Sequence, residues 1–173
     1  NGGSTTTNDA SATSVGDQDS VYQANTTARF SIVTWTGDNS VGANAHGLGT
    51  VPHLMIIKCR SDAEPWEVYH HKNTAAPETD YLRLNTTAAT TDGLPWGDTA
   101  PTSTVFTVGD TGSTNEVSKT YVAYLFSEIQ GYSKFGSYTG NGNADGTFIY
   151  TGFKPAWVMT KQTSGANYWH IHD

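Results

Sequence analysis

Short apolar stretches recur along the chain from residue 30 onward, and clusters of Gly, Asp, Asn and Pro separate them. Several stretches alternate between apolar and polar side chains, which is typical of strands with one buried face. In one of them Trp66 and Val68 flank Glu67, so we expect the two apolar side chains to face the core and Glu67 to face solvent. The pattern predicts six strands, at residues 30–36, 53–60, 66–71, 81–85, 104–108 and 120–128.

Two segments of the predicted strands are apolar on both faces, at residues 54–57 and 121–126. Strands of this kind lie at the centre of a sheet or beneath a partner. Val, Ile and Thr number 44, against 19 for Leu, Glu, Lys and Met together, so β-branched residues greatly outnumber the best helix formers. The sequence therefore predicts an all-β protein, a β-sandwich of the jelly-roll or lectin-like kind, with no helix longer than about two turns.

The charge balance excludes several classes of partner. Nine Lys and Arg stand against sixteen Asp and Glu, and no basic cluster exists. This argues against nucleic acid as a partner, because binding to nucleic acid depends on neutralising phosphates.

The longest wholly apolar run, residues 121–126, is too short to insert into a membrane as a helix. Cys59 is the single cysteine, so it can form no internal disulfide.

An internal repeat divides the chain into three parts. When the sequence is shifted by 103 positions, residues 30–70 align with residues 133–173 without a gap, and eight of the 41 pairs are identical. Several identical pairs are turn residues or aromatic residues, where backbone geometry and packing tolerate least change. We therefore predict a Ser/Thr/Gly/Asn-rich linker or extended arm at residues 1–29, a first sandwich copy at residues 30–131, and a truncated second copy at residues 132–173.

The truncated copy predicts association. We expect about three strands in it, near residues 135–139, 147–150 and 157–171. They would present apolar side chains with too little chain to cover them, namely Phe148, Tyr150, Trp157, Val158, Trp169 and Ile171. Leaving this set bare would cost on the order of 10 kcal/mol, so the first copy, residues of a longer parent protein or another subunit should cover it. An oligomer closed around an axis, a trimer in particular, is the favoured arrangement.

Eight runs of the sequence carry a resemblance to a known family. They are residues 30–37 (FSIVTWTG), 46–52 (HGLGTVP), 56–58 (IIK), 84–89 (LNTTAA), 99–106 (TAPTSTVF), 120–124 (TYVAY), 134–142 (KFGSYTGNG) and 150–159 (YTGFKPAWVM). As a set they resemble an uncharacterised tandem β-repeat domain of large, tail-fibre-like structural proteins of tailed bacteriophages, marine ones especially. The similarity covers nearly the whole chain.

The resemblance implies a non-catalytic structural or adhesion module of a phage virion, a tail fibre or a similar surface appendage. It implies a place at the virion surface or otherwise outside the cell. The partners it implies are other virion proteins, copies of this chain and host-surface glycan. The alternatives are a capsid decoration or head-fibre protein, a carbohydrate-binding or depolymerising tail protein, and a subunit of a non-viral extracellular filament.

Histidines offer one candidate metal site. His170 and His172 lie two positions apart, so they share a face of their predicted strand, and repetition around a trimer axis would place three such pairs about one ion. The equivalent residues of the first copy are Glu67 and Tyr69, which do not repeat the pair. We therefore interpret the two histidines as solvated strand residues.

A loop near the C-terminus resembles the first half of a calcium loop. Asn141, Asn143 and Asp145 place oxygen side chains at alternate positions, and Gly146 follows at the sixth. The twelfth position is Gly152, so the bidentate carboxylate of such loops is missing. We therefore interpret this loop as a β-turn in which Asn, Asp and Gly are used for their dihedral freedom. We predict no cofactor, with calcium at this loop as the alternative.

Catalytic motifs are absent from the sequence. It contains no G-x-S-x-G, no Walker sequence and no H-E-x-x-H. The carboxylates that a glycosidase could use, Asp62, Glu64, Glu67 and Asp80, show no spacing that predicts a facing pair. We predict that the protein is not an enzyme.

Tryptophans supply the candidate ligand-binding residues. Trp66 recurs as Trp169 in the repeat, and repetition at a fixed strand position favours the core. Trp96 has no counterpart and stands in a loop beside Asp98, where an aromatic face could pack on a sugar ring. The sequence therefore predicts that Trp66→Ala costs about 3–5 kcal/mol of stability and Trp96→Ala far less.

Overall fold

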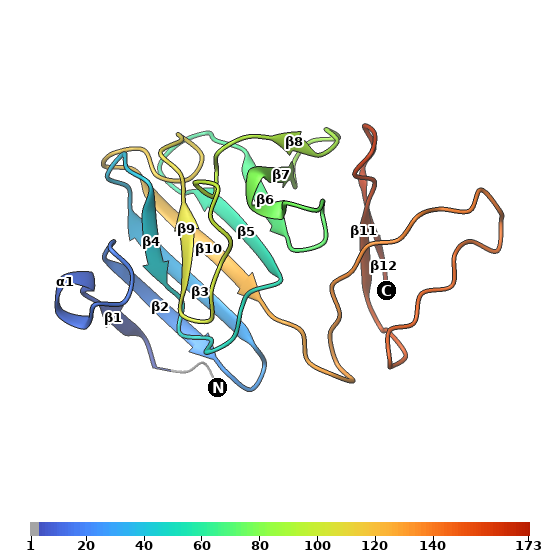
Figure 1. The fold of residues 1–173 in the computed structure, drawn as a ribbon, viewed down its shortest axis with the longest axis horizontal. Helices are drawn as coiled ribbons and strands as arrows, with labels where there is room; N and C mark the ends of the chain where they lie inside the picture. The colour runs from blue at the N-terminus through green and yellow to red at the C-terminus, as the bar shows by residue number, and fades with distance from the viewer. Residues whose placement is uncertain (1–3) are drawn as a thin grey trace.

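The computed structural model describes residues 4–173, and antiparallel strands make up most of its regular structure (Figure 1). One sheet contains eight strands in the order β1-β2-β3-β10-β5-β6-β7-β8. The strands with apolar residues on both faces, β5 and β10, lie side by side in its middle, as predicted. The bounds are β1 Thr6–Asn8, β2 Ser20–Asn25, β3 Phe30–Thr36, β5 Leu54–Cys59, β6 Trp66–His70, β7 Asp80–Arg83, β8 Thr91–Asp92 and β10 Thr120–Phe126.

Two short strand pairs complete the fold. β4 (Gly42–Ala45) pairs with β9 (Val105–Val108) and lies over one face of the sheet (Figure 1). β11 (Val158–Lys161) pairs with β12 (Trp169–His172) near the C-terminus. Within the described residues helix is confined to α1 (Ala10–Thr13) and the 3-10 turn Pro77–Thr79, and no helix there could cross a membrane. The predicted all-β sandwich architecture is confirmed.

The main core lies between the large sheet and the β4–β9 layer. Trp35 and Tyr121 stack there with ring centroids 5.4 Å apart, and Phe106 from β9 meets Trp35 edge-on. The buried residues of this cluster include Val33, Leu48, Met55, Ile57, Cys59, Tyr69, Trp96, Val108, Ala123 and Leu125. The alternating residues of β10 and β5 thus supply one face of a close-packed interior.

Part of the opposite face of the sheet, over β5, β6 and β7, is also covered. Leu54, Val68 and Leu82 form a second cluster, against which Phe135 and Trp169 of the C-terminal segment pack. Glu67 lies on the other face, opposite Ile57 and beside Tyr69 of the main core, so the expectation that Glu67 faces solvent is wrong: it is 1% exposed. Alternation along a strand separates its two faces but does not reveal that a second layer covers the polar one.

The N-terminal segment is part of the sheet. β1 pairs with β2, and β2 pairs with β3 over its whole length, from Ser20 opposite Trp35 to Asn25 opposite Phe30. The interpretation of residues 1–29 as a linker or extended arm is therefore wrong for the described residues, while residues 1–3 lie outside them. Main-chain pairing, which needs no apolar side chains, holds this polar sequence in place.

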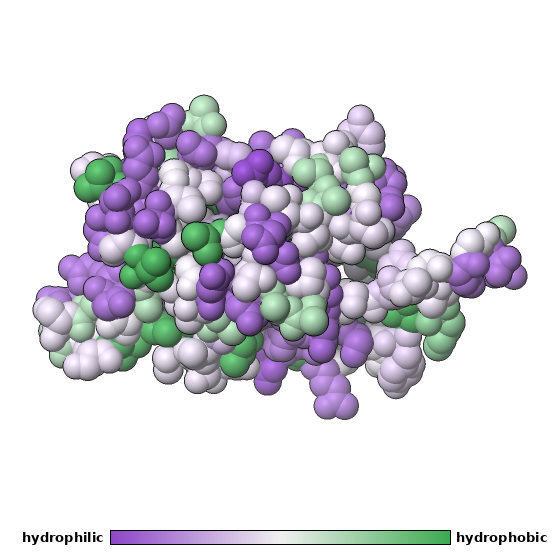
Figure 2. All heavy atoms as spheres, turned by 45° about the horizontal axis from the view of Figure 1, so that its top comes forward, coloured by the Kyte–Doolittle hydropathy of each residue, from purple (hydrophilic) through white to green (hydrophobic). Residues whose placement is uncertain are grey.

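The C-terminal segment forms fewer strands than expected. Residues 136–157 contain no strand, so the strands expected near 135–139 and 147–150 are not formed. The expected strand region at 157–171 forms the β11–β12 hairpin. Figure 2 shows hydrophobic residues together near the base of the loop that projects from this end of the molecule. The sequence predicted that this apolar set is covered, and within the chain only part of it is: Trp169 packs on the first copy, while Phe148 is 88% exposed and Tyr150 is 75% exposed.

A buried amide connects the N-terminal segment to the core. The Asn115 Oδ1 atom accepts hydrogen bonds from Gln18 Nε2 at 2.8 Å and Trp35 Nε1 at 3.1 Å. Its Nδ2 atom donates to Asp38 Oδ1 and to the Ser40 carbonyl, both at 2.9 Å. All four hydrogen-bonding positions of this fully buried amide are therefore occupied.

Substitution of this amide is expected to destabilise the fold. Gln18 Nε2 and Trp35 Nε1 each keep a second acceptor, so we expect Asn115→Ala to lower the free energy of unfolding by about 2 kcal/mol, below the sum of four bonds. Urea denaturation measures the loss, and Asn143→Ala on the exposed C-terminal loop is the control. A loss no larger than that of the control would contradict the assigned network.

Candidate functional site

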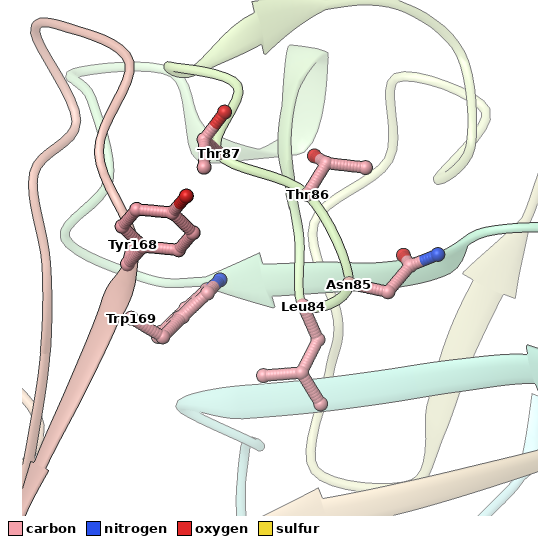
Figure 3. Close-up of a pocket in the computed structure, with 6 residues that line it drawn as sticks. All are labelled: Leu84, Asn85, Thr86, Thr87, Tyr168 and Trp169. Atoms are coloured by element: carbon pink, nitrogen blue, oxygen red, sulfur yellow. The ribbon is translucent and has the colours of Figure 1, made fainter.

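An open groove of about 490 Å³ lies between the loop that follows β7 and the start of β12 (Figure 3). None of its lining residues is charged. One wall is the loop, and the other is formed by two consecutive aromatic residues. The lining residues are Leu84, Asn85, Thr86, Thr87, Tyr168 and Trp169.

Hydrogen bonds between the two walls fix the groove. The Thr87 carbonyl accepts from the Asn167 N–H at 2.8 Å and from Lys161 Nζ at 3.1 Å. The Trp169 indole donates from Nε1 to the Arg83 carbonyl at 2.9 Å. Burial lowers the pKa of Lys161, whose ammonium is held by main-chain carbonyls. All three bonds end on main-chain carbonyls of the loop wall; one comes from a main-chain N–H and two come from the Lys161 and Trp169 side chains.

The exposed groups of the groove suit a neutral ligand rich in hydroxyls. The Tyr168 residue is 71% exposed, so its ring and hydroxyl are open to solvent. The Trp169 side chain is half-buried, because one part packs on the cluster around Leu82. Thr87 lies across from Tyr168, whereas the Asn85 amide points away from the aromatic wall and its Oδ1 atom accepts from the Trp66 N–H at 3.1 Å (Figure 3). An aromatic face beside neutral donors and acceptors can stack on an apolar sugar face and bond its hydroxyls.

The predicted ligand site at Trp96 and Asp98 is not formed. Trp96 is fully buried, meets Tyr69 edge-on at 5.7 Å, and donates from Nε1 to the Asp80 carbonyl. The loop turns its indole inward and leaves Asp98 exposed, so the two side chains present no common surface. The interpretation of Trp96 as an exposed ligand contact is wrong, and Trp66, expected in the core, is only half-buried.

The two candidate metal groups lie apart from the groove lining. His170 and His172 lie on β12 and are exposed. The Asn141 side chain accepts from the Asn143 N–H and donates to the Gly146 carbonyl, which makes a hydrogen-bonded turn. Residues 4–173 contain no group of three or more His, Cys, Asp or Glu side chains placed to share an ion. Asp145 is exposed on the same loop.

The candidate carboxylates are occupied by other contacts. Glu67 Oε1 lies 3.3 Å from Arg83 Nε, while its Oε2 atom is buried without a hydrogen-bond partner. Burial raises the pKa of Glu67. Asp62 pairs with Lys119, and Asp80 accepts from the Thr74 hydroxyl. These contacts join three of the four candidate carboxylates to neighbouring side chains, and none of the four, Glu64 included, lines the groove.

Sequence reasoning missed the groove. Residues 84–87 and 168–169 meet through tertiary packing, and a pattern within either segment does not show the other. One signal was available in the pair Tyr168-Trp169, which follows a turn. Neighbouring residues of a strand point to opposite faces, so a residue next to a core aromatic points away from the core. That alternation could have identified Tyr168 as an exposed aromatic.

Comparison with protein families gives one match. The sequence model of the family described as Domain of unknown function (DUF7483) matches residues 4–173. No curated protein and no solved structure matches the chain.

Proposed function

The chain belongs to the DUF7483 family, a domain of unknown function, and we propose that it is a non-catalytic structural and adhesion module. Its open, uncharged groove with an exposed tyrosine carries this proposal. The ligand is a neutral, hydroxyl-rich glycan of a host surface. The resemblance of the repeat runs to phage structural proteins supports a place on a virion surface appendage, such as a tail fibre.

The structure favours this role over two of its rivals. A long N-terminal arm that orders on a neighbour would favour a capsid decoration protein, but β1 and β2 pair within the chain's own sheet. A depolymerising enzyme needs two facing carboxylates, and none of the six groove residues carries one. Binding without turnover is the activity that the groove supports.

The ligand proposal predicts a specific loss of glycan binding. Titration of the chain with neutral host-surface oligosaccharides should give saturable binding, and Tyr168→Ala should weaken it about tenfold or more. Because Tyr168 is largely exposed, its removal should leave the unfolding transition unchanged. Tyr132→Ala, which removes a tyrosine that is 70% exposed outside the groove, is the matched control and should bind normally.

Three outcomes would contradict the proposal. They are the absence of binding to any such glycan, equal binding by the Tyr168→Ala variant, and release of reducing sugar by the chain. The virion placement is tested separately by immunogold labelling of intact phage particles with an antibody to the chain, which should decorate an external appendage.

A further inference from the structure

The hairpin β11–β12 repeats the register of β5–β6. Val158 pairs with His172 and Lys161 with Trp169, while Met55 pairs with Tyr69 and Lys58 with Trp66. For every residue pair of β11–β12, subtracting 103 from both residue numbers gives a residue pair of β5–β6. The offset of 103 is that of the sequence repeat. A shift of one residue would exchange the faces of the hairpin, so this agreement preserves the facing of each side chain.

The turn of each hairpin is held by the same lysine contact. Lys58 Nζ donates to the Glu64 carbonyl at 2.9 Å, and Lys161 Nζ donates to the Asn167 carbonyl at 2.7 Å. Both the lysines and the accepting residues are 103 positions apart. Two hairpins thus agree in strand register and in the contact that closes their turn.

Their surroundings differ at one edge. In the large sheet β5 pairs with β6 on one side and with β10 on the other. β10 in turn pairs with β3. Within residues 4–173 β11 pairs on one side only, with β12. The absence of a strand in the position of β10 also explains the irregular segment at residues 133–139, because β3, its equivalent in the repeat, is held by β2 and β10.

We propose that the free edge of β11 is a docking site for an extended strand supplied by a neighbouring polypeptide. The strand runs antiparallel to β11, as β10 runs to β5. An unpaired strand edge is a ready template for such an addition, which main-chain hydrogen bonds drive. The proposal concerns assembly and does not depend on the glycan groove.

The exposed side chains of the hairpin define the chemistry of the strand. One face of the hairpin carries Trp157, 56% exposed, and Ile171, 60% exposed, together with Met159. The other face carries Thr160, His170 and Val158, which is 39% exposed. The incoming strand therefore places apolar side chains at alternate positions, on the same face as Trp157.

The sequence of β10 meets this requirement. Tyr124 pairs with Ile56 and Phe126 with Leu54 in the large sheet. In the repeat, Met159 is the equivalent of Ile56 and Trp157 is the equivalent of Leu54. A β10-like strand in the same register would therefore place Tyr124 opposite Met159 and Phe126 opposite Trp157. Apolar side chains then meet the exposed apolar face of the hairpin.

A peptide of residues 118–128 is the probe for the docking site. Fluorescence anisotropy should show saturable binding of the labelled peptide to the full chain. Hydrogen exchange should show new protection of amides in β11 and none in β5. A peptide in which Tyr124 and Phe126 are both replaced by Ser should bind about tenfold more weakly or worse, whereas replacement of Ala123 by Ser should have little effect.

Variants of the chain locate the site. Trp157→Ser should weaken peptide binding about tenfold or more, and Leu94→Ser, which changes a residue 52% exposed outside the hairpin, should not. No binding at about 1 mM peptide would overturn the proposal. So would protection that maps to β5, to β1 or to β8, equal binding of a scrambled peptide, or self-association of the chain through β11 that the peptide does not displace.

Discussion

Replacement of Trp96 by alanine is expected to lower the free energy of unfolding by about 3–5 kcal/mol. The indole is fully buried between β9 and the large sheet, where it meets Tyr69 edge-on. Its Nε1 atom donates to the Asp80 carbonyl at 2.9 Å, so the substitution leaves both a cavity and an unpaired acceptor. Among Trp66, Trp96 and Trp157 this one should give the largest loss.

Two other tryptophans are the controls for this prediction. Trp157→Ala removes a side chain that is 56% exposed, and its expected cost is below about 1 kcal/mol. Trp66 is half-buried, so Trp66→Ala should lie between these values. Urea denaturation at neutral pH gives the stability loss of all three variants. The loss is read from the shift in transition midpoint when the dependence of the unfolding free energy on urea concentration is unchanged. A loss for Trp66→Ala that exceeds the loss for Trp96→Ala would restore the order predicted from sequence and contradict the buried position of Trp96.

The reversal of these tryptophans shows where sequence patterns lose information. Trp96 stands between Pro95 and Gly97, and such residues are typical of a surface turn. The turn in fact closes over the core, because Gly109 approaches Leu94 so closely that an added Cβ would lie 1.8 Å from the Leu94 carbonyl oxygen. A local pattern identifies the turn, and the contact with residue 109 decides which way its side chains point.

Strands were predictable where apolar side chains alternate or run continuously. All six predicted strands exist, and the two that are apolar on both faces occupy the middle of the sheet. The missed strands β1, β2, β4 and β8 are short or polar, and β4 reads Gly-Ala-Asn-Ala. Backbone hydrogen bonds to neighbouring strands hold them, and these bonds leave little trace in side-chain hydropathy.

The candidate site was only partly within reach of the sequence. The repeat aligned Trp66 with Trp169 and so marked an aromatic position that recurs. It did not show that Trp169 packs against the first copy and leaves Tyr168 beside residues 85–87. The groove depends on the placement of one hairpin against a distant loop, and that placement follows from packing on Leu54, Val68 and Leu82.

Acid is expected to destabilise the protein through buried histidine. Burial, with a smaller contribution from the neighbouring His71, lowers the pKa of His70 from 6.5 to about 4. His53 and Glu128 also face this ring, the first lowering and the second raising its pKa. The unfolded chain binds a proton at His70 below about pH 6.5, whereas the folded chain stays neutral there until about pH 4. The stabilising contribution is therefore present above pH 6.5 and is lost as the pH falls toward 4.

The expected loss from His70 alone is about 2 kcal/mol between neutral pH and pH 5, and about 3 kcal/mol by pH 4. His46 and His53, whose pKa values burial also lowers, add losses of the same sign. Glu67 acts in the opposite direction, because its pKa is raised and its protonated form is favoured in the folded chain. Its contribution is present below about pH 4.5 and is lost as the pH rises through its folded pKa.

Two variants separate these contributions. His70→Asn, which retains an acceptor for the Lys72 N–H, should reduce the difference in unfolding free energy between about pH 7.5 and pH 5 by about 2 kcal/mol. Glu67→Gln should enlarge that difference, because it removes the one buried group among these that gains stability as the pH falls. Urea denaturation of the unmodified chain and of each variant, at both pH values, gives the four unfolding free energies needed for each comparison. If His70→Asn keeps the full acid loss, the ring is not protected from protonation in the folded state, and the destabilisation must come from the other buried histidines.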